Sequence, residues 1–274
     1  MKNILVPTDF SQEAEYALKV AAQIAKKQQA SIYLLHLLQM PLYETDAITS
    51  TPNVPDLKFF MEMARERFEE LSKREYLKDL KVHEIIKIDV SFNNISKISE
   101  EHGINLIVMA SNGSQGLEEL IIGSNAEKVV RTSHVPVLVV KDEHKRFSVK
   151  NMIFASDFKN DHKETFNQAS YIAKLFGAKL HLLMVNTPSN FTTTRKANQR
   201  INDFIEDPLH NGYSVNIYND QSVEAGILNF AQDINADLIG ISTHGRQGIA
   251  HLFNGSISED LVNHAKRPVM TFKI

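Results

Sequence analysis

Two stretches that combine glycines with a serine have residue types and a spacing that could bind a phosphate. In each, a glycine is followed by nine residues and a Gly-Ser pair: Gly113 with Gly123 and Ser124, and Gly245 with Gly255–Ser256. A helical pattern follows each pair. Backbone N–H groups at a helix start attract anions, and glycine lets a phosphate come close to the backbone. Each stretch therefore predicts a phosphate site.

The same residues also allow a purely structural interpretation. Ser124 and Ser256 each precede a glutamate by three residues, which is the capping-box pattern S-x-x-E. The glycines could simply permit a positive φ. Neither G-x-x-x-x-G-K-[ST] nor G-x-G-x-x-G occurs, so the loop lacks the lysine that holds β- and γ-phosphates in P-loop proteins. The loop alone leaves a phosphate site and a helix cap both open.

Two aspartates, Asp9 and Asp157, follow the first apolar run of each half of the chain. Each could hold a metal ion or act as a base, or it could hydrogen-bond the adjacent loop. We interpret Ser11 as a helix N-cap, since no G-x-S-x-G nucleophile elbow is present. The histidines show no zinc-binding spacing. We therefore predict no catalytic residue and no metal site.

The elements that position these residues form an internal repeat. KNILVPTDFS, from Lys2, matches KNMIFASDFK, from Lys150, at an offset of 148, and residues 111–141 match 243–273 at an offset of 132, with 11 identities in 31 positions. The second copy is thus shorter in its middle. Repeats of this length are whole domains, and we place them at residues 1–143 and 148–274, with the boundary in the charged stretch 141–150.

Each copy alternates short apolar runs with amphipathic helical patterns, such as residues 14–25 behind Ser11. Runs of this kind are typical of strands buried on both faces. The predicted strands are residues 3–7, 31–38, 81–90, 105–110 and 135–140, then 151–156, 179–186, 213–219, 237–242 and 267–274. Alternation of strand and helix predicts an α/β fold: two tandem doubly wound domains, each a five-stranded parallel sheet with helices on both faces.

In such sheets, ligands bind beyond the carboxyl ends of the strands, near the switch in strand order. Asp9 and the first glycine loop follow different strands at this edge, so we expect them to converge. The segment 41–55 has three prolines and no periodicity. It predicts an irregular loop beside the site that could act as a lid. The mixed-charge segment 60–76 predicts a helix on the sheet.

The combination of PTDFS on the first strand, the segment from the fourth strand into the loop, Gly-x9-Gly-Ser and the terminal VPVLVV resembles the universal stress protein family in its tandem form. The resemblance covers essentially all 274 residues. It implies an adenine nucleotide alpha-hydrolase-like fold and a regulatory protein of the stress response that binds ATP or AMP, with Mg²⁺ if the ligand is ATP.

The family's nucleotide-binding pattern is G-x2-G-x9-G-[ST], and the resemblance assigns roles position by position. The glycines and serines named above, with His244, would contact phosphates. Asp9 or Asp157 would lie near the adenosine, and the end of the second strand, at Leu37 or Val185, would offer its backbone to adenine. The sequence departs from the pattern at the first glycine, where Ala110 and Ser242 stand.

Two other functions stay open at this point. One is a slow ATPase that uses Asp9 or Asp157 with a divalent ion. The other is a scaffold that binds no nucleotide and acts through protein partners, which Ala110 and Ser242 favour. We also expect the last strands, 135–140 and 267–274, to pair within the chain as a pseudo-dimer, which could double into a homodimer.

The composition argues against nucleic acid and membranes as partners. The net charge is −3, which gives no basic field for nucleic acid. No apolar run reaches the roughly 18 residues that would suggest a membrane span. The absence of cysteine excludes disulfides and thiolate chemistry and fits a reducing compartment. Pro7, Thr8 and Asp9 interrupt the apolar run near the start, so it lacks the long apolar core of a signal peptide. We therefore expect a cytoplasmic protein without membrane or nucleic-acid partners.

Overall fold

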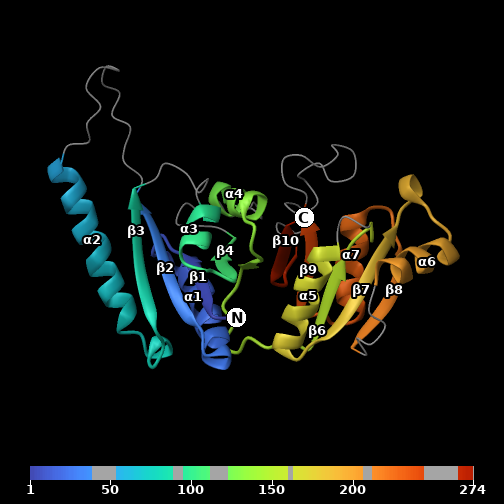
Figure 1. Ribbon diagram of the computed structural model, residues 1–274, viewed down its shortest axis with the longest axis horizontal. Helices are drawn as coiled ribbons and strands as arrows, with labels where there is room; N and C mark the ends of the chain where they lie inside the picture. The colour runs from blue at the N-terminus through green and yellow to red at the C-terminus, as the bar shows by residue number, and fades with distance from the viewer. Residues whose placement is uncertain are drawn as a thin grey trace, which may run out of the picture.

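The computed structural model describes residues 1–38, 54–88, 95–111, 123–159, 163–205, 212–243 and 265–273. Within this part of the chain, ten strands form one sheet with helices on both of its faces (Figure 1). Figure 1 shows two halves side by side, with helices α2 and α6 at the opposite ends. Among the described helices, none has the length and apolar character needed to span a bilayer.

Each half contributes five strands. The first half has β1 (Asn3–Pro7), β2 (Ser31–Leu38), β3 (Val82–Ile88), β4 (Leu106–Ala110) and β5 (Val137–Val140), and the second has β6 (Asn151–Ala155), β7 (Lys179–Asn186), β8 (Tyr213–Asn219), β9 (Leu238–Thr243) and β10 (Val269–Lys273). The order is β3-β2-β1-β4-β5-β10-β9-β6-β7-β8, and all pairs inside a half are parallel. The predicted doubly wound sheets are confirmed.

Helices cover both faces of this sheet. They are α1 (Gln12–Gln28), α2 (Val54–Ser72), α3 (Ile95–Glu101), α4 (Ser124–Thr132), α5 (Lys163–Phe176), α6 (Thr194–Phe204) and α7 (Val223–Asp233), with short 3-10 turns η1 (Glu75–Leu77) and η4 (Pro188–Asn190). One hydrophobic cluster contains residues of α1, α2, α5 and α6, and the other contains residues of α3, α4 and α7. The strand order reverses between β1 and β4, and again between β6 and β9, which fixes the two switch points.

Local sequence explains where α1 begins. The Ser11 side chain accepts a hydrogen bond from the Ala14 N–H at 3.2 Å, so the predicted N-cap is confirmed. Alanines on the inner face of α1 let the helix lie close to the sheet. Helix α2 begins at Val54, although we predicted an irregular loop through Pro55, because proline is tolerated in a first helical turn. The rest of the predicted 41–55 loop lies outside the described residues.

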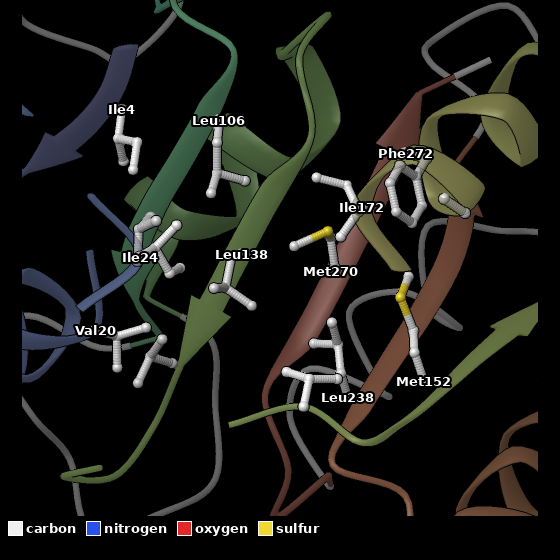
Figure 2. Packing of buried hydrophobic residues seen from close by; sticks show 14 of the residues in the cluster. Ile4, Val20, Ile24, Leu106, Leu138, Met152, Ile172, Leu238, Met270 and Phe272 are labelled. Carbon is white, nitrogen blue, oxygen red and sulfur yellow. The ribbon is translucent and has the colours of Figure 1, made fainter. Parts of the chain in front are cut away.

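The two halves join through their last strands. β5 and β10 pair antiparallel, with Leu138 opposite Met270 and Val139 opposite Val269. Figure 2 shows Leu138 and Met270 on the two strands that meet at this junction, within one cluster of buried side chains drawn from both halves. The expected pairing of the last strands within the chain is therefore present, and it covers the edge that each half would otherwise expose.

The segment 141–150, which connects β5 to β6, runs along α1. The Gln23 side-chain amide donates to the His144 carbonyl at 3.0 Å and accepts from the Phe147 N–H at 2.7 Å. Lys19 pairs with Glu143 at 2.6 Å. These contacts fix the connection on the first half, so the two halves are held by the linker as well as by the sheet.

Candidate functional site

The chain turns sharply where β1 ends. The Phe10 N–H donates to Thr8 Oγ1 at 3.0 Å, and the Ser11 N–H donates to Asp9 Oδ1 at 3.0 Å. Phe10 itself has a φ of 64°, which is uncommon for a residue with a side chain. Side-chain oxygens that accept backbone N–H groups two residues on stabilise such turns. The turn places the Asp9 carboxylate at the carboxyl edge of the sheet.

The end of β6 repeats this turn. The Phe158 N–H donates to Ser156 Oγ at 3.1 Å, the Lys159 N–H donates to Asp157 Oδ1 at 3.3 Å, and Phe158 has a φ of 52°. Backbone geometry is thus repeated along with the sequence. The expectation that each aspartate hydrogen-bonds its adjacent loop is confirmed for both.

The carboxylates differ in their surroundings. Asp9 is exposed, and its Oδ1 also accepts from the Ser11 hydroxyl at 2.5 Å. Asp157 is largely covered, with 15% of its side chain exposed, and its Oδ2 lies 2.8 Å from the Lys159 ammonium. Lys159 stands where the first half has Ser11. The exchange is visible when KNILVPTDFS is aligned with KNMIFASDFK, but nothing in the local sequence shows that the lysine contacts Asp157.

The backbone N–H and C=O groups at the end of β2 point toward the space past the last residue of β1. Leu35, whose carbonyl accepts from the Thr8 N–H at 2.9 Å, presents its backbone groups to β1. Groups two residues apart on a strand point the same way, so those of Leu37 face the same side. The last registered pair of β1 with β2 is Pro7 with Leu35. The polar groups of Leu37 therefore lie next to the turn at Asp9 and not next to a continuing strand.

Val185 repeats this arrangement in the second half. The Leu183 carbonyl accepts from the Ser156 N–H at 3.2 Å, and β6 pairs with β7 only as far as Ala155 with Leu183. Helix α7 packs against this point, because a Cβ added to Gly226 would lie 2.5 Å from Val185 Cγ1. Gly226 was not among the predicted site residues, since nothing in its local sequence reveals what it packs against.

The first glycine loop leaves the sheet and returns to nearly the same point. The Ser111 N–H donates to the Val140 carbonyl at 3.1 Å, and the Gly123 N–H donates to the Ser111 carbonyl at 2.8 Å. Register places the loop beside the aspartate: Leu5 pairs with Ile107, so Asp9, four residues on, ends beside Ser111. Among the described residues, the strand register therefore supports the predicted convergence of the glycine loop with Asp9.

Helix α4 starts at this point in a way that corrects the capping-box alternative. Its N-cap is Gly123, and Ser124 is the first helical residue. The Glu127 Oε1 accepts from Arg131 at 2.9 Å. Because Gly123 has no side chain, no side-chain oxygen at the N-cap position accepts a hydrogen bond from the first backbone N–H groups of α4.

The two departures from the family's glycine pattern lie in the protein core. Ala110 belongs to the cluster packed under α1. The Ser242 hydroxyl, in a residue only 7% exposed, lies 3.2 Å from the hydroxyl of fully buried Thr165 on α5. Both side chains therefore point into the layer between sheet and helix.

Several predicted residues cannot be placed. They lie outside the described part of the chain and are Gly113, His244, Gly245, Gly255 and Ser256. In the described ranges, no group of three or more histidine, aspartate or glutamate side chains could hold a metal ion.

Comparisons with known proteins fit this geometry. A family model described as the universal stress protein family matches residues 1–141 and 216–273. Universal stress protein MJ0577 of Methanocaldococcus jannaschii is 32% identical over 153 residues, which cover 51% of this chain and 94% of the relative. Universal stress protein YxiE of Bacillus subtilis is 32% identical over 145 residues, covering 50% of this chain and 97% of the relative.

A solved structure matches both halves together. The crystal structure of a universal stress protein from Archaeoglobus fulgidus has a TM-score of 0.72 and 22% identity, and the match covers 99% of this chain and 96% of that one. This likeness shows the fold. Relatives that match half of the chain, together with a structure that matches all of it, agree with two domains of one kind in tandem.

Proposed function

Since the chain belongs to the universal stress protein family, we propose that it is a regulatory protein of the stress response that binds an adenine nucleotide, ATP or AMP, at the carboxyl edge of each half. Each site comprises the turn that carries Asp9 or Asp157, the end of the second strand at Leu37 or Val185, and the glycine loop. The domain limits 1–143 and 148–274, a cytoplasmic location and assembly into a homodimer are parts of the same proposal.

The orientation of the Leu37 and Val185 backbones carries the proposal. Each residue lies beyond the end of the neighbouring strand, beside a switch point where α/β sheets bind ligands. The edge of an adenine presents an N–H donor next to a ring acceptor. A backbone carbonyl and N–H can match both, which selects adenine over guanine.

The start of α4 supports a phosphate site in the first half. Gly123 occupies the N-cap position without a capping side chain, and the loop returns to Ser111 through a backbone hydrogen bond of 2.8 Å. Anions are stabilised at such helix starts by N–H groups and by the helix dipole. The second half is included because the sequence repeat aligns its loop with the first one; the corresponding residues are His244, Gly245, Gly255 and Ser256.

The buried positions of Ala110 and Ser242 remove an objection. A side chain at the first glycine position would hinder a ligand if it pointed toward the loop. Because both side chains pack under a helix, they leave the ligand side of the strand to the backbone. The fit to a nucleotide therefore does not depend on glycine at these positions.

Thermal unfolding of the nucleotide-stripped protein tests the proposal. A ligand at about 100 times its dissociation constant adds roughly 2.7 kcal/mol to the free energy of unfolding. ATP with Mg²⁺, and AMP, should raise the melting temperature, whereas GTP should not. Gly123→Leu and Gly255→Leu should each remove part of the shift. Gly212→Ala serves as the control, because a Cβ there meets no atom within 4 Å. The absence of any shift at millimolar ATP would contradict the proposal.

A further inference from the structure

Strand β8 ends the ten-stranded sheet on the side of the second half (Figure 1). It pairs with β7, and the Leu180 N–H donates to the Gly212 carbonyl at 3.2 Å. Because backbone groups alternate in direction along a strand, those of Ser214, Asn216 and Tyr218 also face β7. The N–H and C=O groups of the residues between them therefore point away from the sheet; these residues are Tyr213, Val215, Ile217 and Asn219.

The outward groups of β8 are unpaired. No hydrogen bond to them occurs within the part of the chain that the structure describes. Helix α6 lies on one face of the sheet, where it buries Ala197, Ile201 and Phe204, and Val215 at the edge is 36% exposed. A row of unpaired backbone groups at a sheet edge is a template for one more strand.

The opposite edge of the sheet, β3, differs in charge. The strand registers, combined with the repeat, align Glu84 of β3 with Val215 of β8, and Lys87 with Tyr218. Strand β8 reads YSVNIYN and contains neither a charged residue nor a proline. Charged residues and prolines on an edge strand oppose pairing with another chain. The sheet is therefore protected by charge at β3 and unprotected at β8.

The sequence of β8 is complementary to a second copy of itself. In an antiparallel pair about a two-fold axis at Asn216, all seven residues of the strand have a partner. Val215 of one copy lies opposite Ile217 of the other, and Tyr213 lies opposite Asn219. Cross-strand pairs of β-branched side chains stabilise such sheets. The chain already joins its own halves by an antiparallel strand pair, β5 with β10.

Helix α6 adds a match of charge. It connects the parallel strands β7 and β8 and therefore runs opposite to them. In the two-fold pair the two α6 helices lie on the same face of the sheet and run antiparallel, so the first turn of one is directed toward the last turn of the other. The first turn carries exposed Arg195 and Lys196, and the last turn carries exposed Asp203. Opposite charges therefore approach each other across the axis.

We propose that β8 is the dimerisation edge of this protein. Two copies of the chain pair β8 with β8, antiparallel about Asn216, and form one continuous sheet. This inference rests on the homodimer that is part of the proposed function, and it names the surface that forms it. It does not depend on nucleotide binding.

Sedimentation of the full-length protein tests the proposal. The unmodified protein should have the mass of two chains. Val215→Lys places a charge at the edge, and Val215→Pro removes an outward N–H that makes no bond within the chain. Each should raise the dissociation constant of the dimer by about tenfold or more. Glu84→Lys, at the equivalent position of β3, is the matched control and should stay dimeric. Circular dichroism must show that the variants are folded; if Val215→Pro is not, Val215→Lys decides alone.

A disulfide tests the register, because the chain has no cysteine of its own. In Asn216→Cys the two cysteines would face each other with Cα atoms about 4.5 Å apart, which a disulfide can span. Oxidation should therefore link two chains. Asn219→Cys is the control and should not link them, since its two copies would lie about 20 Å apart along the strands.

The outcomes separate this inference from the proposed function. A protein that stays monomeric at all concentrations would overturn both the β8 pairing and the homodimer. A dimer that persists unchanged in Val215→Lys, or the absence of a disulfide in Asn216→Cys, would overturn the β8 pairing alone. Binding of ATP, measured on the same samples by calorimetry, should be the same in Val215→Lys and in the unmodified protein, so its failure would count against the proposed nucleotide site and not against the dimer.

Discussion

The ammonium of Lys273, on the last strand of the second half, lies 3.3 Å from the carbonyl oxygen of Thr132 at the end of α4 in the first half. The Ser96 hydroxyl donates to the same oxygen at 2.7 Å. Helix α4 begins at the first glycine loop, and Lys273 pairs with Thr243, where the second loop departs. A single side chain thus connects the elements that carry both loops.

Replacement of this lysine should destabilise the protein. A cation at a helix C-terminus contributes about 1 kcal/mol, and more where it is partly buried. Burial lowers the pKa of Lys273. Lys273→Met keeps the apolar stem and should lower the free energy of unfolding in urea by about 1 kcal/mol. Lys266→Met, at an exposed residue, is the control. Identical urea midpoints for the two variants would show that the contact contributes nothing.

The close approach of Gly226 to Val185 predicts a steric effect. A Cβ at residue 226 would lie 2.5 Å from Val185 Cγ1 and 3.2 Å from Asp220 Cβ. Gly226→Ala should therefore cost about 1–3 kcal/mol of stability, since overpacking forces shifts of the backbone. It should also weaken nucleotide binding in the second half, because Val185 moves. Gly212→Ala should do neither. An unchanged melting temperature in Gly226→Ala would mean that α7 does not pack as closely as described.

Restoring the family's glycine at residue 242 tests whether that departure affects binding. The Ser242 side chain lies against Thr165 and not toward the glycine loop. Ser242→Gly should therefore leave the ATP dissociation constant unchanged within about twofold, and should lower stability by about 1 kcal/mol through lost packing and added chain entropy. Ala110→Gly should behave in the same way. A tenfold gain in ATP affinity in either variant would show that the Cβ obstructs the ligand.

His181 predicts a pH dependence of stability. Its ring lies between Ser214, at 2.9 Å from Nδ1, and Asn151, at 3.3 Å from Nε2. Burial, with a smaller effect of Lys179, lowers the pKa of His181 below the ordinary value. In the unfolded chain the histidine takes up its proton near pH 6.5, before the folded protein does, so stability falls as the pH drops below that value.

His181→Gln keeps polar atoms for the network and removes the titration. The variant should lose part of the slope of unfolding free energy against pH below about pH 6.5. Urea unfolding at several pH values between 7.5 and 5 measures this slope. A slope identical to that of the unmodified protein would show that His181 does not carry the effect.

The sequence was sufficient for elements that depend on local pattern. The apolar runs predicted all ten strands, and Ser11 marked the start of α1, because burial on both faces and capping are expressed within a few residues. The exposed edge that each half would otherwise have, together with the resemblance to the family, predicted the pairing of the last strands. The start of α2 at Val54 was missed because a proline-rich segment reads as a loop until the tertiary context of the helix is known.

The details of the site depend on contacts between distant residues. Ser124 reads as a capping residue in the sequence, whereas the loop's return to Ser111 makes Gly123 the N-cap. The role of Lys159 depends on the turn that folds it back onto Asp157, and Phe158 holds that turn in a conformation that its type does not predict. Residue types therefore predicted where the candidate site lies, whereas contacts such as the Lys159–Asp157 ion pair depend on tertiary geometry.

The central claim is that the carboxyl edges bind adenine nucleotide, and calorimetric titration of the stripped, full-length protein with ATP and Mg²⁺ tests it most directly. We expect saturable heat with a micromolar dissociation constant, which corresponds to a binding free energy of about −8 kcal/mol. We also expect a stoichiometry of up to two ATP per chain, reduced by one in Gly123→Leu. Absence of heat at millimolar ATP, or isotherms of Gly123→Leu and Gly255→Leu that are both identical to that of the unmodified protein, would contradict it and direct the search to protein partners.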